Sequence, residues 1–146
     1  MYRSHCALAN FLEHFGDKWS LIIIRDMFLG KKTFNDFLTS PEGIASNILT
    51  NRLKSLMKDN LIDYKISPSN KKVKFYYMED RAIDSYPVLM EMVKWSSKNL
   101  SKNFGPGSIK WIKDIKLNSP EELVLKSVSH YKKIRKEIFD NSLERS

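Results

Sequence analysis

The sequence predicts a mainly α-helical fold with one small β-hairpin and a C-terminal helical extension. Three observations carry this prediction. Apolar residues recur at the spacing of an amphipathic helix in several segments, which Gly, Pro or Ser residues separate. Two runs rich in β-branched and aromatic residues, 61–66 and 73–78, flank a turn-forming segment in mid-chain. A Ser-Pro-Glu-Glu helix start at 119–122 then opens a last helix beyond the hairpin.

Two apolar helices open the chain. Helical spacing of apolar residues predicts a first helix over 4–15, which Gly16 ends as a C-cap. Asp17 is expected to cap a second helix, which continues to Phe28 and ends at Gly30. Because this second helix is apolar on nearly every side, we expect it to lie in the centre of the core.

A short helix, a turn and a longer helix follow. Thr33 caps the short helix, which runs to residue 38, and Ser-Pro-Glu-Gly at 40–43 forms the turn. We expect Ser46 to cap the longer helix. Its apolar positions recur at i, i+4 and i+7, so one stripe faces inward, Leu49, Leu53 and Leu56. Its opposite face shows polar side chains, Asn47, Thr50, Asn51 and Lys54.

The hairpin and the helices after it complete the chain. Residues 67–72 join the two β-rich runs and give the hairpin a basic tip. A helix over 80–99 carries an apolar stripe, and Pro87 leaves two alternatives: a kink within it, or a helix that begins at Pro87 with Ser85 as its cap. Residues 104–107 predict a linker, and the last helix is expected to reach about Leu143. We therefore expect one domain over 6–104 and an extension over 105–146.

Positive charge is concentrated in two segments. The chain of 146 residues carries a net charge of +8, but residues 1–49 contribute none of it. Residues 50–75 are at +5 and residues 101–146 at +4, with −1 between them. The mid-chain excess is what a phosphate-facing surface needs, although a solvated charged face is the alternative.

Composition excludes several other classes of protein. The longest apolar run, Leu21–Ile24, is four residues, far short of the roughly 18–20 of a membrane span, so no membrane association is expected. The N-terminus lacks an apolar signal segment, and the single Cys6 rules out a disulfide framework, so we expect a reducing, cytoplasmic location. The three histidines show no metal-ligand spacing, and no phosphate loop or nucleophile elbow occurs. We expect neither an enzyme nor a cofactor or metal site.

The order helix, short helix, turn, helix, hairpin is that of a winged helix-turn-helix, which binds double-stranded DNA. Its second helix enters the major groove, where the first turns from Ser46 reach base edges and Asn suits adenine. Base contacts are therefore expected from the polar face, Ser46, Asn47, Thr50 and Asn51. Phosphate contacts are expected from lysines, Lys54, Lys71 and Lys72. The start of the short helix, Lys31, Lys32 and Thr33, offers further charge and backbone N–H groups to a phosphate.

Two alternatives remain at this surface. The alternative to base contacts is that the polar residues of the longer helix are ordinary exposed positions. Their low helix propensity weakens the helix, and this cost favours a functional role. Arg52 lies close to the inward stripe, so a structural ion pair is favoured over a base contact.

Five segments share motifs with one family of bacterial regulators. The first two are Cys6 with Gly16-Asp17-Lys18-Trp19 and the apolar run behind it, and the Gly–basic–Phe run at 30–37. The other three are the recognition-helix segment at 43–56, Asn60-Leu61-Ile62 at the wing entry, and Pro87-Val88-Leu89 with Trp95. In this order and with these gaps, they resemble the HxlR-type winged helix-turn-helix transcription regulators, which are related to MarR-type regulators. Ala7, Asp17, Met78 and Arg81 depart from the family pattern, and residues 101–146 exceed its usual length.

The resemblance implies a homodimer on an inverted-repeat operator, with the first helix and the Pro87–Leu100 helix at the interface. It also makes Cys6 a candidate redox or electrophile sensor, with Arg3 and His5 near it in sequence; an inert thiol is the alternative. The extension has three possible roles: to enlarge the dimer interface, to wall a pocket for a small-molecule effector, or to add a basic DNA contact. A ligand-binding or interaction module without sequence-specific DNA binding is the alternative function.

Overall fold

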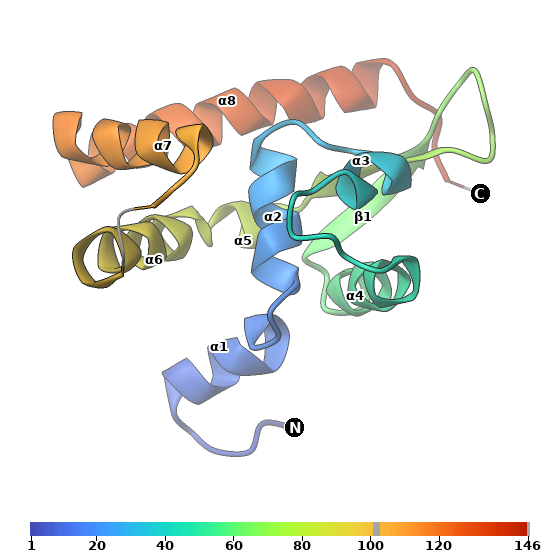
Figure 1. Cartoon of the computed structure of the whole chain (residues 1–146). Coiled ribbons are helices and arrows are strands. Elements are labelled where there is room, and N and C mark those ends of the chain that lie inside the picture. Colours follow the sequence, from blue (N-terminus) through green and yellow to red (C-terminus); the bar gives the residue numbers. More distant parts are fainter. Residues whose placement is uncertain (101–102, 146) are drawn as a thin grey trace.

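The computed structural model describes residues 1–100 and 103–145. Helices dominate the described chain, and one antiparallel hairpin interrupts them (Figure 1). The elements in chain order are α1 (Ala7–Phe15), α2 (Ser20–Phe28), α3 (Phe34–Leu38), α4 (Ser46–Lys58), β1 (Ile62–Ile66), β2 (Lys74–Met78), α5 (Asp80–Ile83), α6 (Tyr86–Asn99), α7 (Pro106–Leu117) and α8 (Pro120–Asp140). The mainly helical winged fold expected from the sequence is confirmed.

Helix α2 stands at the centre of the molecule. It lies between α8 at one end and α1 at the other, with α3 and α4 on one side and α6 on the other (Figure 1). Ile23, Ile24 and Met27 are at most 2% exposed, as the apolar sequence of α2 requires. The inward stripe of α4 meets this core, because Leu49, Leu53 and Leu56 are equally buried.

The wing is a two-stranded sheet whose outer edges need partners. Ile62 pairs with Met78 and Ile66 with Lys74 across the hairpin. On the outer edge of β2, the N–H of Tyr76 donates to the carbonyl of Lys32 at 2.7 Å. This bond attaches the wing to the segment that enters α3. A hairpin of two strands is marginal alone, so such outside contacts matter for its order.

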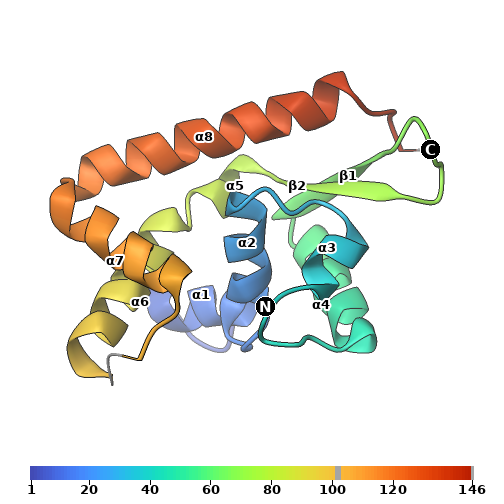
Figure 2. The same cartoon turned by 45° about the horizontal axis from the view of Figure 1, so that its top comes forward.

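The C-terminal helices pack back on the same chain. Helix α7 lies against α6, and α8 runs over the molecule from α7 to the wing (Figure 2). Along its course α8 contacts α6, α2 and β2, and it buries Leu123, Tyr131 and Ile138. The extension is therefore part of the core packing and not a separate appendage.

Several expected boundaries move. The first helix begins at Ala7 and not at residue 4, with Cys6 as its N-cap. Asp17 is not the N-cap of α2, because Trp19 occupies that position; Asp17 lies in the turn before it, where its Oδ1 accepts the N–H groups of Trp19 and Ser20 at 2.8 and 2.9 Å. Ser46 is not the cap of α4: Ala45 occupies that position in extended conformation, and Ser46 is the first helical residue.

Three later boundaries also differ from those expected from the sequence. The helix expected over 80–99 divides into α5 and α6, with Ser85 as the N-cap of α6 and Pro87 in its first turn, where a missing N–H costs nothing. The expected linker at 104–107 is helical from Pro106. The last helix ends at Asp140, short of Leu143, because Leu143 pairs with a strand instead.

No helix within residues 1–100 and 103–145 is long and apolar enough to cross a membrane.

Candidate nucleic-acid interface

Helix α4 presents a polar face that the rest of the described chain leaves uncovered. Asn47, Asn51 and Lys54 are exposed, while the inward-facing leucines of the same helix are buried. Within the described residues, none of these three side chains forms a hydrogen bond or ion pair. Their amide and ammonium groups are therefore available to an outside ligand.

Thr50 and Ser46 are less free than the asparagines. The Thr50 hydroxyl donates to the carbonyl of Ser46 at 2.9 Å, one turn earlier in the helix. Thr50 is half-buried, and its hydroxyl proton is already used within α4. Ser46 is exposed at the first turn of α4, where a side chain can reach beyond the helix end.

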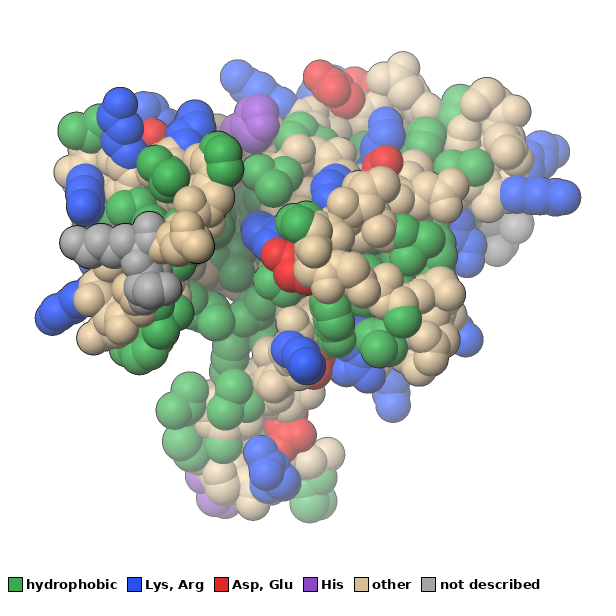
Figure 3. All heavy atoms as spheres, in the orientation of Figure 1, with side chains coloured by type: hydrophobic (Ala, Val, Ile, Leu, Met, Phe, Trp, Pro, Cys, Tyr) green, Lys and Arg blue, Asp and Glu red, His purple; other side chains and the backbone are tan. Residues whose placement is uncertain are grey.

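The tip of the wing carries two exposed lysines, Lys71 and Lys72. The tip is folded by Asn70, whose side-chain oxygen accepts the N–H of Lys72 at 3.0 Å and whose carbonyl accepts the N–H of Val73 at 2.9 Å. The N–H of Ser67 donates to the carbonyl of Val73 and closes the loop. Basic side chains project at this end of the molecule (Figure 3). The wing therefore holds two ammonium groups at the end of a defined turn.

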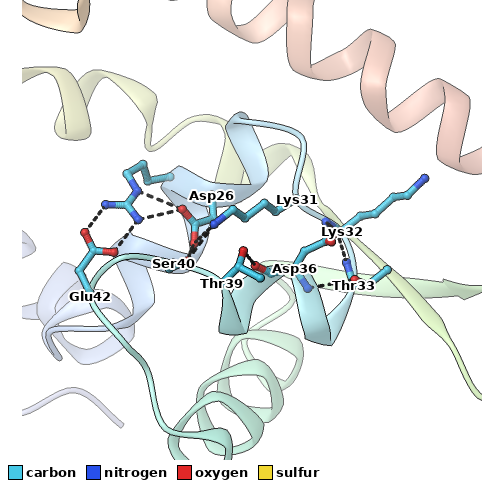
Figure 4. A network of polar contacts seen from close by, with 9 residues as sticks. Asp26, Lys31, Lys32, Thr33, Asp36, Thr39, Ser40 and Glu42 are labelled. Carbon is cyan, nitrogen blue, oxygen red and sulfur yellow. Dashed lines mark hydrogen bonds and ion pairs between the residues drawn. The ribbon is translucent and has the colours of Figure 1, made fainter. Parts of the chain in front are cut away.

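Lys31 does not face outward as expected. Its Nζ lies 3.1 Å from the Ser40 hydroxyl and 3.7 Å from Oδ2 of Asp26 (Figure 4). Asp26 is 2% exposed and also accepts a hydrogen bond from Ser40. A buried carboxylate needs positive partners. Lys31 is therefore held as a structural partner of Asp26, which counts against the phosphate contact expected from the sequence.

The start of α3 is also already occupied. Thr33 and Asp36 form a capping box, in which the Thr33 hydroxyl accepts the N–H of Asp36 at 3.1 Å. The Asp36 carboxylate in turn accepts the N–H groups of Lys32 and Thr33, both at 3.0 Å. Those are the groups that the sequence offered to a phosphate. An internal carboxylate therefore takes the place that was expected for an external anion, which counts against a phosphate contact through these N–H groups.

The electrostatics of Asp36 agree with this arrangement. Burial works to raise its pKa, but the donors from Lys32 and Thr33 outweigh burial, so the pKa lies below its usual value. Lys32 keeps a partly exposed ammonium group, which lies 4.3 Å from the ring centre of Phe75 on β2. Lys31 and Lys32 are both partly exposed, but of the two only the Lys32 ammonium has no hydrogen bond or ion pair within the described residues.

Arg52 forms the ion pair that the sequence favoured. Its guanidinium lies 3.5 Å from Oδ2 of Asp17, which stands in the turn before α2. Burial works to raise the pKa of Asp17, yet its hydrogen bonds with Ser20 and Trp19 and the charge of Arg52 hold that pKa below its usual value. The pair connects the start of α2 to the middle of α4.

Sequence reasoning missed a polar network that fixes the entry to α4. The Arg25 guanidinium donates to both oxygens of Glu42 at 2.8 Å and also to Oδ1 of Asp26 at 2.8 Å (Figure 4). The hydrogen bond from Arg25 holds the pKa of Glu42 below its usual value. Glu42 stands in the turn that Gly43 completes at φ +70°, a value that favours glycine. The adjacent opposite charges Arg25 and Asp26 were the available signal.

Apolar side chains remain uncovered at the other end of the molecule. Leu8 and Leu12 project from α1, and Met92 and Trp95 project from α6. Trp95 is 60% exposed and Leu8 68%. Figure 3 shows hydrophobic side chains gathered on α1. Large exposed apolar patches are common at interaction sites, so this end of the molecule is a candidate for one.

Cys6 is the N-cap of α1, the helix that carries part of this apolar surface. It is exposed, and its carbonyl accepts the N–H of Asn10 in the first turn of α1. Arg3, expected as a possible helper, pairs with Glu13 at 2.5 Å. The guanidinium of Arg3 is therefore already paired with a carboxylate. His5 is exposed.

A family model described as HxlR-like helix-turn-helix matches residues 14–104. The chain belongs to the HxlR-like helix-turn-helix family. The match begins on α1 and ends after α6, so it includes the α3–α4 pair, the wing and part of the apolar end. The resemblance inferred from the sequence motifs is confirmed. Relatives in Bacillus subtilis and Mycobacterium bovis are named as transcriptional regulators, not as enzymes.

Two relatives illustrate the range of proteins that this chain is similar to. The HTH-type transcriptional regulator YdeP of Bacillus subtilis is 32% identical over 97 residues, which cover 64% of this chain and 73% of YdeP. The HTH-type transcriptional regulator Mb3122 of Mycobacterium bovis is 27% identical over 95 residues, 65% of this chain. The aligned part spans 60% of the length of Mb3122.

Solved structures support the HxlR-like fold. The crystal structure of PA1607, named provisionally as a transcription factor, is 30% identical with a TM-score of 0.62 and covers 71% of this chain and 70% of PA1607. The redox regulator HypR in its oxidized form is 26% identical with a TM-score of 0.58 and covers 66% of this chain and 99% of HypR.

A third structure reaches beyond the family match. A SlyA-like transcription regulator from Listeria monocytogenes is 18% identical with a TM-score of 0.56 and covers 94% of this chain and 85% of its own. This likeness concerns the fold alone. Its coverage exceeds what residues 1–104 can supply, so α7 or α8 has a counterpart in that fold, although the sequence alone indicated none.

Proposed function

We propose that this chain is a homodimeric transcription regulator that binds an inverted-repeat operator in double-stranded DNA. The uncovered polar face of α4 is the observation that carries the proposal. Asn47 and Asn51 have free amide groups, and an Asn amide reads adenine through two hydrogen bonds in the major groove. Lys54 on the same helix and Lys71 and Lys72 on the wing then hold the flanking phosphates.

Dimerisation supplies the symmetry that an inverted repeat requires. The exposed apolar side chains of α1 and α6 would be buried against a second copy across a two-fold axis. The two α4 helices would then enter major grooves about one DNA turn apart, roughly 34 Å. The net charge of +5 in residues 50–75 would be doubled across one face of the dimer.

Binding-site selection on random duplexes tests the proposal first, because it reports DNA binding, symmetry and half-site spacing together. On the selected duplex, Asn51→Ala is expected to lose the preference at one base position, at a cost of about 1–3 kcal/mol. Lys72→Ala is expected to weaken binding to all duplexes equally and to lower the salt slope by about one. No duplex binding at low salt by an intact dimer would leave only a ligand-binding or interaction module.

Modulation through Cys6 is part of the proposal. Cys6 is exposed beside the apolar face of α1, and HypR, 26% identical to this chain, is named as a redox regulator. Because no second cysteine exists in the chain, any disulfide joins two subunits or a small thiol. Diamide should release the operator from the native chain and leave Cys6→Ser bound. An equal response of Cys6→Ser would remove Cys6 from the mechanism and leave a small-molecule effector as the modulator.

A further inference from the structure

The two outer edges of the wing are held by the same C-terminal segment. In a two-stranded sheet, every second N–H and C=O of each strand points away from its partner and needs another group. Met78 presents an N–H and a C=O on the outer edge of β2, and Ile66 presents an N–H and a C=O on the outer edge of β1. Both pairs are satisfied by residues beyond position 130.

Helix α8 binds the edge of β2. The N–H of Met78 donates to the Tyr131 hydroxyl at 2.7 Å, and the carbonyl of Met78 accepts from the Arg135 guanidinium at 3.0 Å. Arg135 also pairs with Asp80 at 2.9 Å, just beyond the strand. Tyr131 is 1% exposed and packs on Phe28 of the central helix. The end of β2 is therefore attached to the core through α8.

Residues 143–145 bind the edge of β1. Leu143 exchanges two backbone hydrogen bonds with Ile66, each at 2.7 Å, as in an antiparallel bridge. Glu144 pairs with Lys65, and Arg145 pairs with Asp63 at 2.8 Å and stacks over Tyr64. The C-terminal end of the chain lies beside the wing in both ribbon views (Figures 1 and 2).

The face between these two edges is also covered by α8. The ring of Phe139 meets the ring of Tyr77 edge-on, with centres 4.7 Å apart, and Ile138 is buried. The C-terminal segment thus crosses the hairpin from the edge of β2 to the edge of β1. Ile66 is the last residue of β1, directly before the loop that carries Lys71 and Lys72.

We propose that Tyr131, Arg135 and Leu143 are positioning residues, through which the C-terminal extension orients the wing for its phosphate contacts. This inference rests on the proposed DNA-binding function. A wing tip whose base is fixed before binding loses less conformational entropy when its lysines meet phosphates. The extension, left with three alternative roles by the sequence, then acts on DNA through the wing and not by direct contact.

A chain that ends at Ser142 tests the role of residues 143–145. It retains all of α8 and loses the bridge and both ion pairs of the tail. We expect its affinity for the selected operator to fall about fivefold, equivalent to about 1 kcal/mol. Hydrogen exchange at the Ile66 amide, which donates to Leu143, should accelerate in the same chain. Unchanged affinity together with unchanged exchange would overturn the inference.

A matched pair of variants isolates the bridge. Leu143→Pro removes the N–H that donates to Ile66, whereas Leu143→Val keeps it with a similar apolar side chain. Leu143→Pro should resemble the shortened chain, and Leu143→Val should resemble the native one. Equal affinities for the two variants would show that the bridge does not position the wing.

A double-mutant cycle separates positioning from general stability. If the tail acts through the wing lysines, shortening the chain should cost little once Lys71 and Lys72 are both alanine. Full additivity of the two losses would overturn the inference, because a merely structural loss adds to the loss of the lysines. If the native chain binds no duplex, the proposed function fails. Exchange at Ile66 then still reports whether the tail holds the wing.

Discussion

The hydroxyl of Tyr131 accepts the backbone N–H of Met78 at 2.7 Å in the buried seam between α8 and the wing. Tyr131→Phe keeps the ring and leaves this N–H without a partner, so the free energy of unfolding should fall by about 1–3 kcal/mol. Tyr86→Phe is the matched control, since Tyr86 also packs on Phe28 and its hydroxyl has no hydrogen-bond partner in the described chain. Urea denaturation of the three proteins measures the difference. Equal losses in both variants would contradict the role of the Met78 bond.

Alkaline pH should destabilise the native chain through the same residue. Burial raises the pKa of Tyr131 to about 12 from its ordinary value of 10.0. Below pH 10 the phenol keeps its proton in folded and unfolded states, and its contribution is complete. Between pH 10 and 12 the unfolded chain loses the proton first, so up to about 2–3 kcal/mol of stability is lost. Tyr131→Phe should lack this part of the pH dependence. Parallel curves of stability against pH for the native chain and for Tyr131→Phe above pH 10 would exclude this contribution of Tyr131.

Lys31→Ala should affect stability and not DNA binding. Its ammonium group contacts Ser40 and the buried Asp26, so its loss should lower the free energy of unfolding by about 1–2 kcal/mol. The salt dependence of binding to a random duplex should stay as in the native chain. Lys72→Ala, at the exposed wing tip, should show the opposite pattern, with unchanged stability and a reduced salt slope of DNA binding. A reduced salt slope for Lys31→Ala at unchanged stability would restore the phosphate contact expected from the sequence.

Arg52→Ala should leave operator choice unchanged. The 3.5 Å pair with Asp17 is partly exposed on both sides, so its removal should cost about 0.5 kcal/mol of stability. Binding-site selection with the variant should return the native sequence preference. Asn51→Ala is the positive control for a changed preference. A base position that becomes degenerate in the Arg52 variant would identify Arg52 as a base contact instead.

The apolar faces of α1 and α6 should hold the dimer together. Leu12→Glu and Trp95→Glu each place a charge where a second copy would bury an apolar side chain, so both should yield monomers at micromolar concentration. Leu29→Glu is the control, because Leu29 is 72% exposed at the end of α2, on neither helix. Light scattering after gel filtration gives the masses. A dimeric mass for both variants would place the interface elsewhere.

Local patterns in the sequence carried the prediction of most helices and of the hairpin. Capping at Thr33 and Ser119, the inward stripe of α4 and the break before Pro87 each depend on neighbours within a few positions. Side-chain spacing and caps act at that range, so a single chain displays them. The outward face of α4 was predicted from the same short-range spacing. The structure leaves its polar residues uncovered.

The sequence by itself determined most of the helical segments, although not α7, as well as which sides of them are apolar and where positive charge is concentrated. Tertiary structure alone decided that Lys31 turns to a buried carboxylate and that Asp36 occupies the N–H groups at the start of α3. It also decided that the extension closes on the wing. The Tyr131–Met78 bond joins residues 53 positions apart. No periodicity encodes such a partner, because its choice depends on where the whole core places each strand edge.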